Sequence, residues 1–78
     1  MNNIERIEKV FRTVLIEDNA AGFSESATMD EINSWDSLNF INIIIALEQE
    51  FDLKIDGLDA AEMTSIPRIL GYIEDNGS

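Results

Sequence analysis

One stretch decides the fold of this chain: DSLNFINIIIALEQEF, residues 36–51. Apolar residues recur along it every three or four positions, which is the spacing of one helix face. They are Phe40, Ile43, Ile44, Leu47 and Phe51. The β-branched run at 43–45 would suit a strand, but polar and apolar residues do not alternate and helix formers surround the run. We therefore predict a helix over residues 36–51 with one buried face.

The same stretch carries a second apolar stripe beside the first. This stripe consists of Leu38, Ile41 and Ile45, and it leaves few polar positions on the helix. A surface helix of a small bundle needs less apolar surface than this. The excess therefore predicts a docking face for a partner, a wide contact with the core or a dimer seam.

The residues before this stretch predict one helix and a long loop. Residues 3–17 show helical periodicity, and Asn2 with Glu5 has the form of a capping box. Periodicity is lost from Asp18 to Asp36, where Asn, Gly and Ser supply turn chemistry. A connection of this length is uncommon in a compact domain, so it indicates either function or short ordered pieces. The apolar residues expected to pin it are Phe23, Met29, Ile32 and Trp35.

The residues after this stretch predict two further helices. Residues 52–57 carry a turn signal, and a short helix is predicted near 58–64. The last helix should begin at Thr64-Ser65, where a hydroxyl can cap it and Pro67 is tolerated in the first turn. We expect this helix to fray over residues 74–78. Its buried stripe is predicted to be Ile66, Ile69, Leu70 and Ile73.

Together these elements predict an all-α fold. It is a small four-helix bundle, with three main helices, one short helix and a long loop between the first two. The chain has no repeat and no linker, so we expect residues 1–78 to form a single domain. A domain of this size has room for one small core but not for an enclosed active-site cleft.

The chain is strongly acidic, and its charges are unevenly placed. Sixteen Asp and Glu residues face five Lys and Arg residues, giving a formal net charge of −11. Three of the five basic residues, Arg6, Lys9 and Arg12, lie in the first twelve positions. Such a field repels nucleic acid and anionic lipid and attracts basic protein surfaces. A basic protein patch is therefore the expected partner, although acids also serve simply to keep a small protein in solution.

The absence of cysteine and histidine limits the chemistry that the chain can perform. It excludes disulfides, thiolates and any side chain with an unperturbed pKa near neutrality. We do not expect an enzyme, because the carboxylates that remain leave too little for catalysis. The first residues lack the features of a signal peptide, and no stretch approaches the roughly 18–20 apolar residues of a membrane span. A cytoplasmic location is therefore expected.

A serine stands where the long loop meets the central helix, and alone it would be interpreted as a helix cap. The residues around it indicate more. The tripeptide Asp36-Ser37-Leu38 is followed by Ala46-Leu47-Glu48, and the stretch closes at Glu50-Phe51. This pattern resembles the signature of the acyl carrier protein family. The resemblance is collinear over nearly the whole chain and extends to Thr64-Ser65-Ile66 and beyond.

The resemblance implies that Ser37 carries 4′-phosphopantetheine, with Asp36 and Leu38 as the flanks of the motif. Coenzyme A would be the donor and a phosphopantetheinyl transferase would install the arm, since the chain has no local base to activate the hydroxyl. A helix N-terminus also favours the charge of a phosphodiester by about 0.3–1 kcal/mol. The thiol of the arm would hold an acyl or aminoacyl group as a thioester, in fatty acid, polyketide or other specialised biosynthesis.

The resemblance also implies a docking face along the central helix of a monomeric carrier. This face would bind acyl-loading and acyl-processing enzymes through their basic patches. The matching residues are Asp36, Leu38, Ile41, Ile45 and Glu48, with Glu62 on the short helix. Asn39 and Asn42 stand where family members often have acids, which favours a dedicated pathway over the general fatty-acid enzymes. Trp35 is a further variation, and we expect it to anchor the loop.

A shelter for the cargo is a further implication of the resemblance. In the fatty-acid branch of the family the core separates slightly around an acyl chain. The residues that would line such an opening here are Ile43, Ile44, Leu47 and Ile69. An ordinary packed core without a cavity is the alternative.

Two other functions compete with a carrier. The segment Asp52-x-Lys54-x-Asp56-Gly57 mimics the opening of a calcium-binding EF-hand, but its third position is a cation and its twelfth is Met63 instead of a bidentate Glu. No metal site is therefore predicted. The main alternative is a helical protein–protein interaction module in which an unmodified Ser37 acts as a helix cap.

Overall fold

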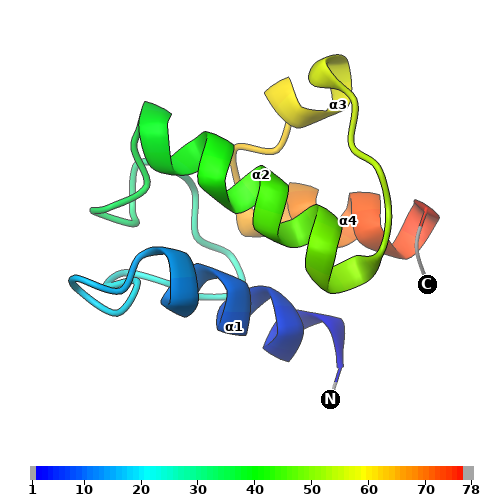
Figure 1. Ribbon diagram of the computed structural model, residues 1–78. Coiled ribbons are helices and arrows are strands. Elements are labelled where there is room, and N and C mark those ends of the chain that lie inside the picture. Colours follow the sequence, from blue (N-terminus) through cyan, green and yellow to red (C-terminus); the bar gives the residue numbers. More distant parts are fainter. Residues whose placement is uncertain (1, 77–78) are drawn as a thin grey trace.

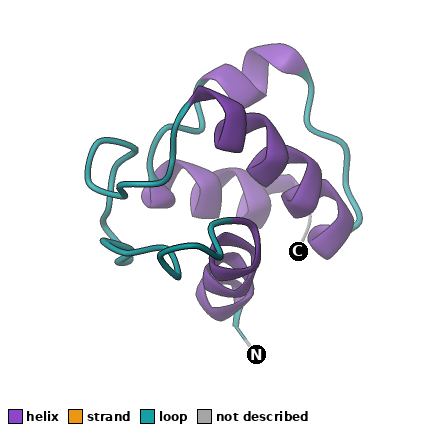
Figure 2. Cartoon of the chain, turned by 60° about the vertical axis from the view of Figure 1, so that its left-hand side comes forward, coloured by secondary structure: helices purple, strands orange, loops and turns teal. Residues whose placement is uncertain are grey.

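The computed structural model describes residues 2–76, and in this range it contains four α-helices and no strand. The helices are α1 (Asn3–Val14), α2 (Ser37–Phe51), α3 (Gly57–Ala61) and α4 (Ile66–Asn76). In Figure 1, α2 crosses the middle of the molecule between α1 and α3, with α4 behind it. The long loop joins α1 to α2 along one side of the bundle (Figure 2). The predicted all-α bundle of three main helices and one short helix is confirmed.

The core lies where α1, α2 and α4 meet the long loop. Helices α1 and α4 each turn one apolar stripe inward, while α2 is apolar around more of its circumference. Burial of such stripes holds helices of this length together, because a short isolated helix is only marginally stable in water. The buried apolar residues are Ile7, Val10, Phe11, Leu15, Ala20, Ala27, Ile32, Trp35, Ile43, Ile44, Leu47, Phe51, Ile55, Met63, Ile66, Ile69 and Ile73.

The predicted caps of α1 and α4 are confirmed. The Asn2 side chain accepts a hydrogen bond from the Glu5 N–H (2.9 Å), and the Glu5 carboxylate accepts one from the Asn2 N–H (3.1 Å), so the capping box is complete. At α4, the Ser65 hydroxyl accepts a hydrogen bond from the Arg68 N–H (3.3 Å), and Pro67 lies in the first turn. Both starts therefore satisfy amides that have no partner within the helix.

Helix α1 ends at Val14, three residues before the predicted end at residue 17. The chain turns here: the Ala20 N–H donates to the Leu15 carbonyl (3.0 Å), and Asn19 and Ala20 both have positive φ. Leu15 nevertheless remains buried. Its helical spacing thus reflects its burial and not a further helical turn.

The long loop is ordered by short turns and by apolar side chains. Ile32 and Trp35 are buried and Phe23 and Met29 are partly buried, as predicted. The Trp35 ring lies edge-on to Phe11 of α1, with their centroids 4.8 Å apart, and Phe23 is 5.5 Å from Phe11 on the same measure. Aromatic pairs at these separations contribute beyond the area they bury.

Two backbone hydrogen bonds join the middle of the loop to the start of α4. The Met29 N–H donates to the Thr64 carbonyl and the Ile66 N–H to the Ala27 carbonyl, each at 2.8 Å, around a single antiparallel β-bridge. The second bond satisfies one of the amides at the start of α4. The length of the loop predicts either a function or short ordered pieces. The structure shows that the short ordered pieces are present.

Helix α3 spans Gly57–Ala61, whereas a helix over 58–64 was predicted. It begins one residue earlier because the Asp56 side chain accepts a hydrogen bond from the Asp59 N–H (2.9 Å) and caps it. It ends three residues earlier because the next residues leave the helix to reach the core and the loop. Met63 is buried by this change of direction.

Helix α4 begins at Ile66, just after the predicted Thr64-Ser65, and continues to Asn76. The prediction that residues 74–78 fray is wrong for 74–76, and residues 77 and 78 lie outside the described range. The Asn76 side chain donates to the Tyr72 carbonyl (2.9 Å), which satisfies one acceptor in the last turn. No helix within residues 2–76 has the length and apolarity needed to cross a membrane.

A cluster of charged and aromatic side chains fastens the C-terminal end of α2 to α1. Arg6 donates to the Glu50 carboxylate (3.0 Å) and to the Glu50 carbonyl (2.6 Å), and its guanidinium lies 4.3 Å from the centre of the Phe51 ring. Lys9 lies 3.9 Å from the same carboxylate. The hydrogen bond from Arg6 lowers the pKa of the Glu50 carboxyl below its ordinary value, burial opposes this, and the charge of Lys9 adds to the lowering.

Candidate functional site

Ser37 is the first residue of α2, and it is exposed. Asp36 caps the helix, because its carboxylate accepts a hydrogen bond from the Asn39 N–H (2.9 Å). The alternative prediction that Ser37 itself caps the helix is therefore wrong. Within residues 2–76 the Ser37 hydroxyl makes no hydrogen bond to another side chain or to the backbone. It is available to a partner from outside the chain.

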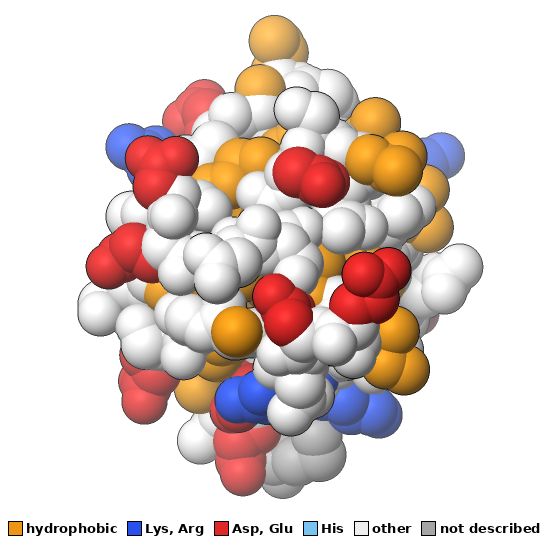
Figure 3. All heavy atoms as spheres, turned by 90° about the vertical axis from the view of Figure 1, so that its left-hand side faces the viewer, with side chains coloured by type: hydrophobic (Ala, Val, Ile, Leu, Met, Phe, Trp, Pro, Cys, Tyr) orange, Lys and Arg blue, Asp and Glu red, His pale blue; other side chains and the backbone are white. Residues whose placement is uncertain are grey.

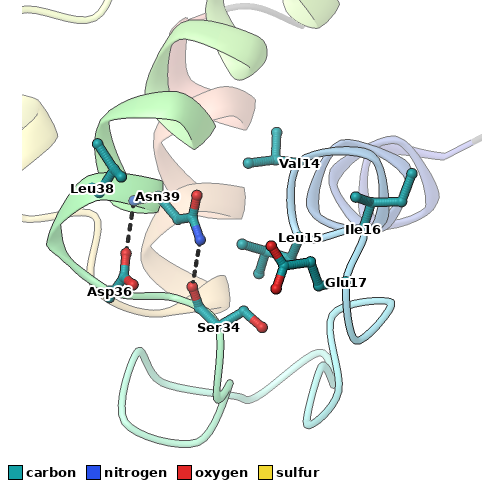
Figure 4. A pocket seen from close by; sticks show the side chains of 8 residues that line it. All are labelled: Val14, Leu15, Ile16, Glu17, Ser34, Asp36, Leu38 and Asn39. Carbon is teal, nitrogen blue, oxygen red and sulfur yellow. Dashed lines mark hydrogen bonds between the residues drawn. The ribbon is translucent and has the colours of Figure 1, made fainter.

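Asn39 ties the end of the long loop to the first turn of α2 (Figure 4). Its side-chain N–H donates to the Ser34 carbonyl (2.9 Å), and its side-chain oxygen accepts a longer hydrogen bond from Asn42 (3.4 Å). A carboxylate at position 39 could not donate the first of these bonds. The asparagine that departs from the acidic family pattern therefore has a structural role at the entrance to the helix.

A shallow groove of about 410 Å³ opens beside Ser37. It lies between α2 and the C-terminal end of α3, with a contribution from the long loop. Its lining is apolar except for the hydroxyls of Ser37 and Thr64. The other residues that line it are Met29, Phe40, Ile41 and Ala61.

The second apolar stripe of α2 faces outward. Leu38, Ile41 and Ile45 are 71%, 57% and 48% exposed. Their spacing of three and four residues places them in one row along the helix. The stripe is therefore not a wide core contact, and a docking face or a dimer seam remains.

The acidic residues predicted for the docking face have different environments. Asp36 and Glu62 are exposed, and Glu62 lies 3.9 Å from Arg68. Glu48 is half-buried, and its carboxylate accepts a hydrogen bond from the Ile55 N–H (2.8 Å). One oxygen of Glu48 thus serves the connector after α2, and one oxygen of Asp36 serves the cap of α2. Each carboxylate keeps a second oxygen, and Asp36 is the more exposed of the two.

A second hollow, of about 400 Å³, lies between the end of α1 and the start of α2 (Figure 4). Ile16 stands on its α1 side and is 75% exposed, and Leu38 stands on its α2 side. The carboxylates of Glu17 and Asp36 also line it. Ile16 falls inside the helix predicted over residues 3–17, and no surface role was predicted for it. Its outward position depends on the turn after Val14, for which periodicity gives no signal.

Figure 3 views the molecule from the side on which α2 begins. Acidic and apolar side chains are mixed on this face. Three of the five basic residues of the chain are engaged elsewhere. Arg6 and Lys9 pair with Glu50, and Arg12 pairs with Glu8 at 2.6 Å. The positive charge near the N-terminus is thus used within α1 and at the far end of α2, which leaves the surface around Ser37 acidic.

The segment that resembles an EF-hand opening has another structure. Asp52 ends α2 in the left-handed conformation, with φ 52°, and Asp56 caps α3. Within residues 2–76, no three Asp, Glu, His or Cys side chains are grouped so that they could hold a metal ion. The backbone of Asp52 thus ends one helix, and the carboxylate of Asp56 caps the next.

The residues predicted to shelter a cargo are packed in the core. Ile43, Leu47 and Ile69 have no exposed surface, and Ile44 has almost none. An acyl chain could enter among them only if α2 and α4 moved apart. Sheltering stays a prediction.

The chain is similar to a known protein over nearly its whole length. No family model matches it. A curated relative, the acyl carrier protein of Buchnera aphidicola subsp. Schizaphis graminum (strain Sg), is 29% identical over 76 residues, which cover 96% of this chain and 95% of the relative. The similarity thus includes all four helices as well as the region of Asp36-Ser37-Leu38. The predicted resemblance of this chain to the acyl carrier protein family is confirmed.

Proposed function

We propose that this protein is a stand-alone carrier that holds acyl or aminoacyl groups as thioesters on a 4′-phosphopantetheine arm attached to Ser37. One observation carries the proposal. An exposed serine hydroxyl without a partner in the described chain begins a helix that Asp36 already caps, at the position of the family motif. The chain is a carrier and not an enzyme, as the full-length similarity to an acyl carrier protein supports.

The start of α2 suits a phosphodiester. The amides of the first turn have no partner within the helix, and Asp36 satisfies only that of Asn39. The amides of Ser37 and Leu38 therefore remain for an anion, and the helix dipole favours a negative charge here by about 0.3–1 kcal/mol. These groups would hold the phosphate of the arm close to the end of the helix.

The attachment itself requires a transferase. The serine oxygen forms a bond to the phosphorus next to the pantetheine of coenzyme A, the pyrophosphate linkage breaks, and the nucleotide leaves. The hydroxyl proton must pass to a base of the transferase, because no side chain in residues 2–76 hydrogen-bonds Ser37. When bound, the arm supplies a thiol, which this cysteine-free chain lacks.

The surfaces next to Ser37 suit a carrier of apolar cargo. The groove formed with Met29, Phe40 and Ile41 offers apolar surface to an attached arm or acyl group without any movement of the core. Entry among Ile43, Ile44 and their neighbours is the alternative and needs the core to open. Both would keep part of the cargo out of water.

The enzymes that load and process the cargo are proposed to dock on the exposed side of α2. Leu38, Ile41 and Ile45 offer apolar surface, and Asp36 and Glu62 add negative charge for basic patches. Because Asn39 and Asn42 are neutral, this face is less acidic than the net charge of the chain. This supports a specialised pathway over general fatty acid synthesis. We further propose that the carrier is monomeric and acts in the cytoplasm.

Intact-mass measurement tests the proposal. The chain is incubated with coenzyme A and a promiscuous phosphopantetheinyl transferase. We expect the mass of a single arm on the wild type and on Ser26→Ala, a control in an exposed serine of the long loop, and none on Ser37→Ala. If no transferase adds an arm, or if Ser37→Ala still gains one, the proposal is wrong and an interaction module remains.

A further inference from the structure

The hollow between α1 and α2 borders Ser37, because Asp36 and Leu38, the residues on either side of Ser37 in the motif, both line it. Ile16 and Glu17, in the turn after α1, also line it. Ile16 is one of the most exposed large apolar residues of the described chain. Exposed apolar side chains grouped beside a functional residue are typical of an interaction surface.

An enzyme that acts on Ser37 must cover more than α2. A stable protein interface buries about 800 Å² on each partner. The described chain exposes only 4676 Å², within extents of 29 × 27 × 20 Å. An interface of that size centred on Ser37 takes in a sizeable part of the surface and includes Leu38, which lines the hollow together with Ile16.

The charges of the side chains that line the hollow indicate what kind of partner surface would bind there. Two of its eight lining residues, Glu17 and Asp36, are acidic and none is basic. The nearby Arg12 is already bound to Glu8 and to the Asn19 carbonyl. A complementary surface therefore brings positive charge to the two carboxylates and apolar area to Ile16 and Leu38.

We propose that Ile16 and Glu17 belong to the docking surface and take an apolar side chain flanked by Arg or Lys from the enzymes that act at Ser37. This inference rests on the proposed carrier function. It adds the turn after α1 to a face that was predicted only on α2 and α3. Contacts from the turn after α1 and from α2, two separate segments, fix the orientation of a partner better than one helical stripe does.

Steady-state kinetics of arm transfer test this inference, with the full chain as substrate and coenzyme A saturating. Ile16→Ser removes the apolar contact and is expected to raise the KM for the carrier about tenfold, with kcat within about twofold. Glu17→Lys should raise KM several-fold at 50 mM NaCl and less at 500 mM. Glu74→Lys on exposed α4 makes the same change in net charge and should leave KM within about twofold.

The outcomes separate the two proposals. Unchanged KM values for Ile16→Ser and Glu17→Lys, with Ser37 modified normally, overturn the inference and leave the carrier function intact. Equal effects of Glu17→Lys and Glu74→Lys also overturn it, since only net charge would then matter. A wild-type chain that no transferase modifies overturns both. Circular dichroism of each variant must match the wild type, as expected for changes at exposed positions.

Discussion

The two ends of α2 are held in place by different kinds of interaction. The C-terminal end is fastened by charge, through Arg6, Lys9 and Glu50, with the guanidinium stacked on Phe51. The N-terminal end, where Ser37 lies, makes no ion pair among the described residues. It is held by the Asp36 cap, by the neutral Asn39–Ser34 hydrogen bond and by the aromatic contacts of the preceding Trp35.

This difference shows how a chain with few basic residues keeps one end of a helix open. Three of its five basic residues, Arg6, Lys9 and Arg12, make ion pairs away from Ser37. The end of α2 that carries the free hydroxyl is anchored by contacts that need no basic residue. The acids around Ser37 thus keep their charge available for other proteins. If this is correct, the two ends should respond differently to mutation, salt and pH.

The largest effect is expected at the neutral end. Phe11→Ala removes the ring on which Trp35 and Phe23 pack and should lower the free energy of unfolding by about 3–5 kcal/mol. A chain of this length has a total stability of roughly 4–12 kcal/mol. Urea denaturation followed by circular dichroism measures the loss relative to the wild type. We expect the same loss at 50 and 500 mM NaCl, and a strongly salt-dependent loss would contradict the comparison.

At the charged end, Arg6→Met keeps an apolar stem but removes the guanidinium. The lost stacking on Phe51 and the lost bond to the Glu50 carbonyl should lower the free energy of unfolding by about 1–2 kcal/mol. This loss should shrink at 500 mM NaCl. Arg12→Met, whose ion pair with Glu8 lies within one helix, is the control and should cost about 0.5 kcal/mol or less. Equal losses for the two arginines would show that the charged cluster has no special role.

A new charge at the neutral end should also destabilise it. Asn39→Asp loses the bond to Ser34 and brings a carboxylate toward a carbonyl, which costs about 1–3 kcal/mol, while the helix dipole returns about 0.3–1 kcal/mol. We expect a net loss near 1 kcal/mol in urea denaturation. Asn42→Asp makes the same change in charge on an exposed part of α2 and should cost less. A larger loss for Asn42→Asp would mean that Asn39 does not hold the loop.

The smallest effect is the pH dependence of the charged end. Because Arg6 lowers the pKa of Glu50 in the folded chain, this carboxylate stabilises the fold at neutral pH. This contribution to the free energy of unfolding is complete above the pKa that Glu50 has in the unfolded chain. It is lost as the pH falls from that value through the lower pKa of the folded chain. The difference in urea midpoint between the wild type and Glu50→Gln should therefore be larger at pH 7 than at pH 3.5. If the difference in urea midpoint does not change with pH, the charge of the Glu50 carboxylate does not stabilise the fold through Arg6 and Lys9.

The sequence predicts the parts of the fold that local chemistry determines. The bounds of α2, the capping box at Asn2 and the cap at Ser65 follow from residue type and spacing, and all three are confirmed. The ends of α1 and α3 do not follow, because Leu15 and Met63 are buried after the helix has stopped. Helical spacing reports burial, and a turn can bury a side chain as well as a helix does.

The candidate site was only partly predictable for the same reason. Ser37 and the exposed stripe of α2 could be placed from the motif and the excess of apolar positions. The amide of Asn39 and the outward direction of Ile16 depend on how the loop meets α2 and on where α1 turns. These are contacts between separate segments, to which a pattern along the chain gives no access.

The position of Trp35 has a practical consequence. It is the only indole in the chain, it precedes Ser37 by two residues, and it is almost fully buried against Phe11. Its ring packs edge-on against Phe11, so its emission should change when the packing of the segment before Ser37 changes. The protein thus contains its own optical reporter, and events at the neighbouring serine can be followed in real time without a dye or a label.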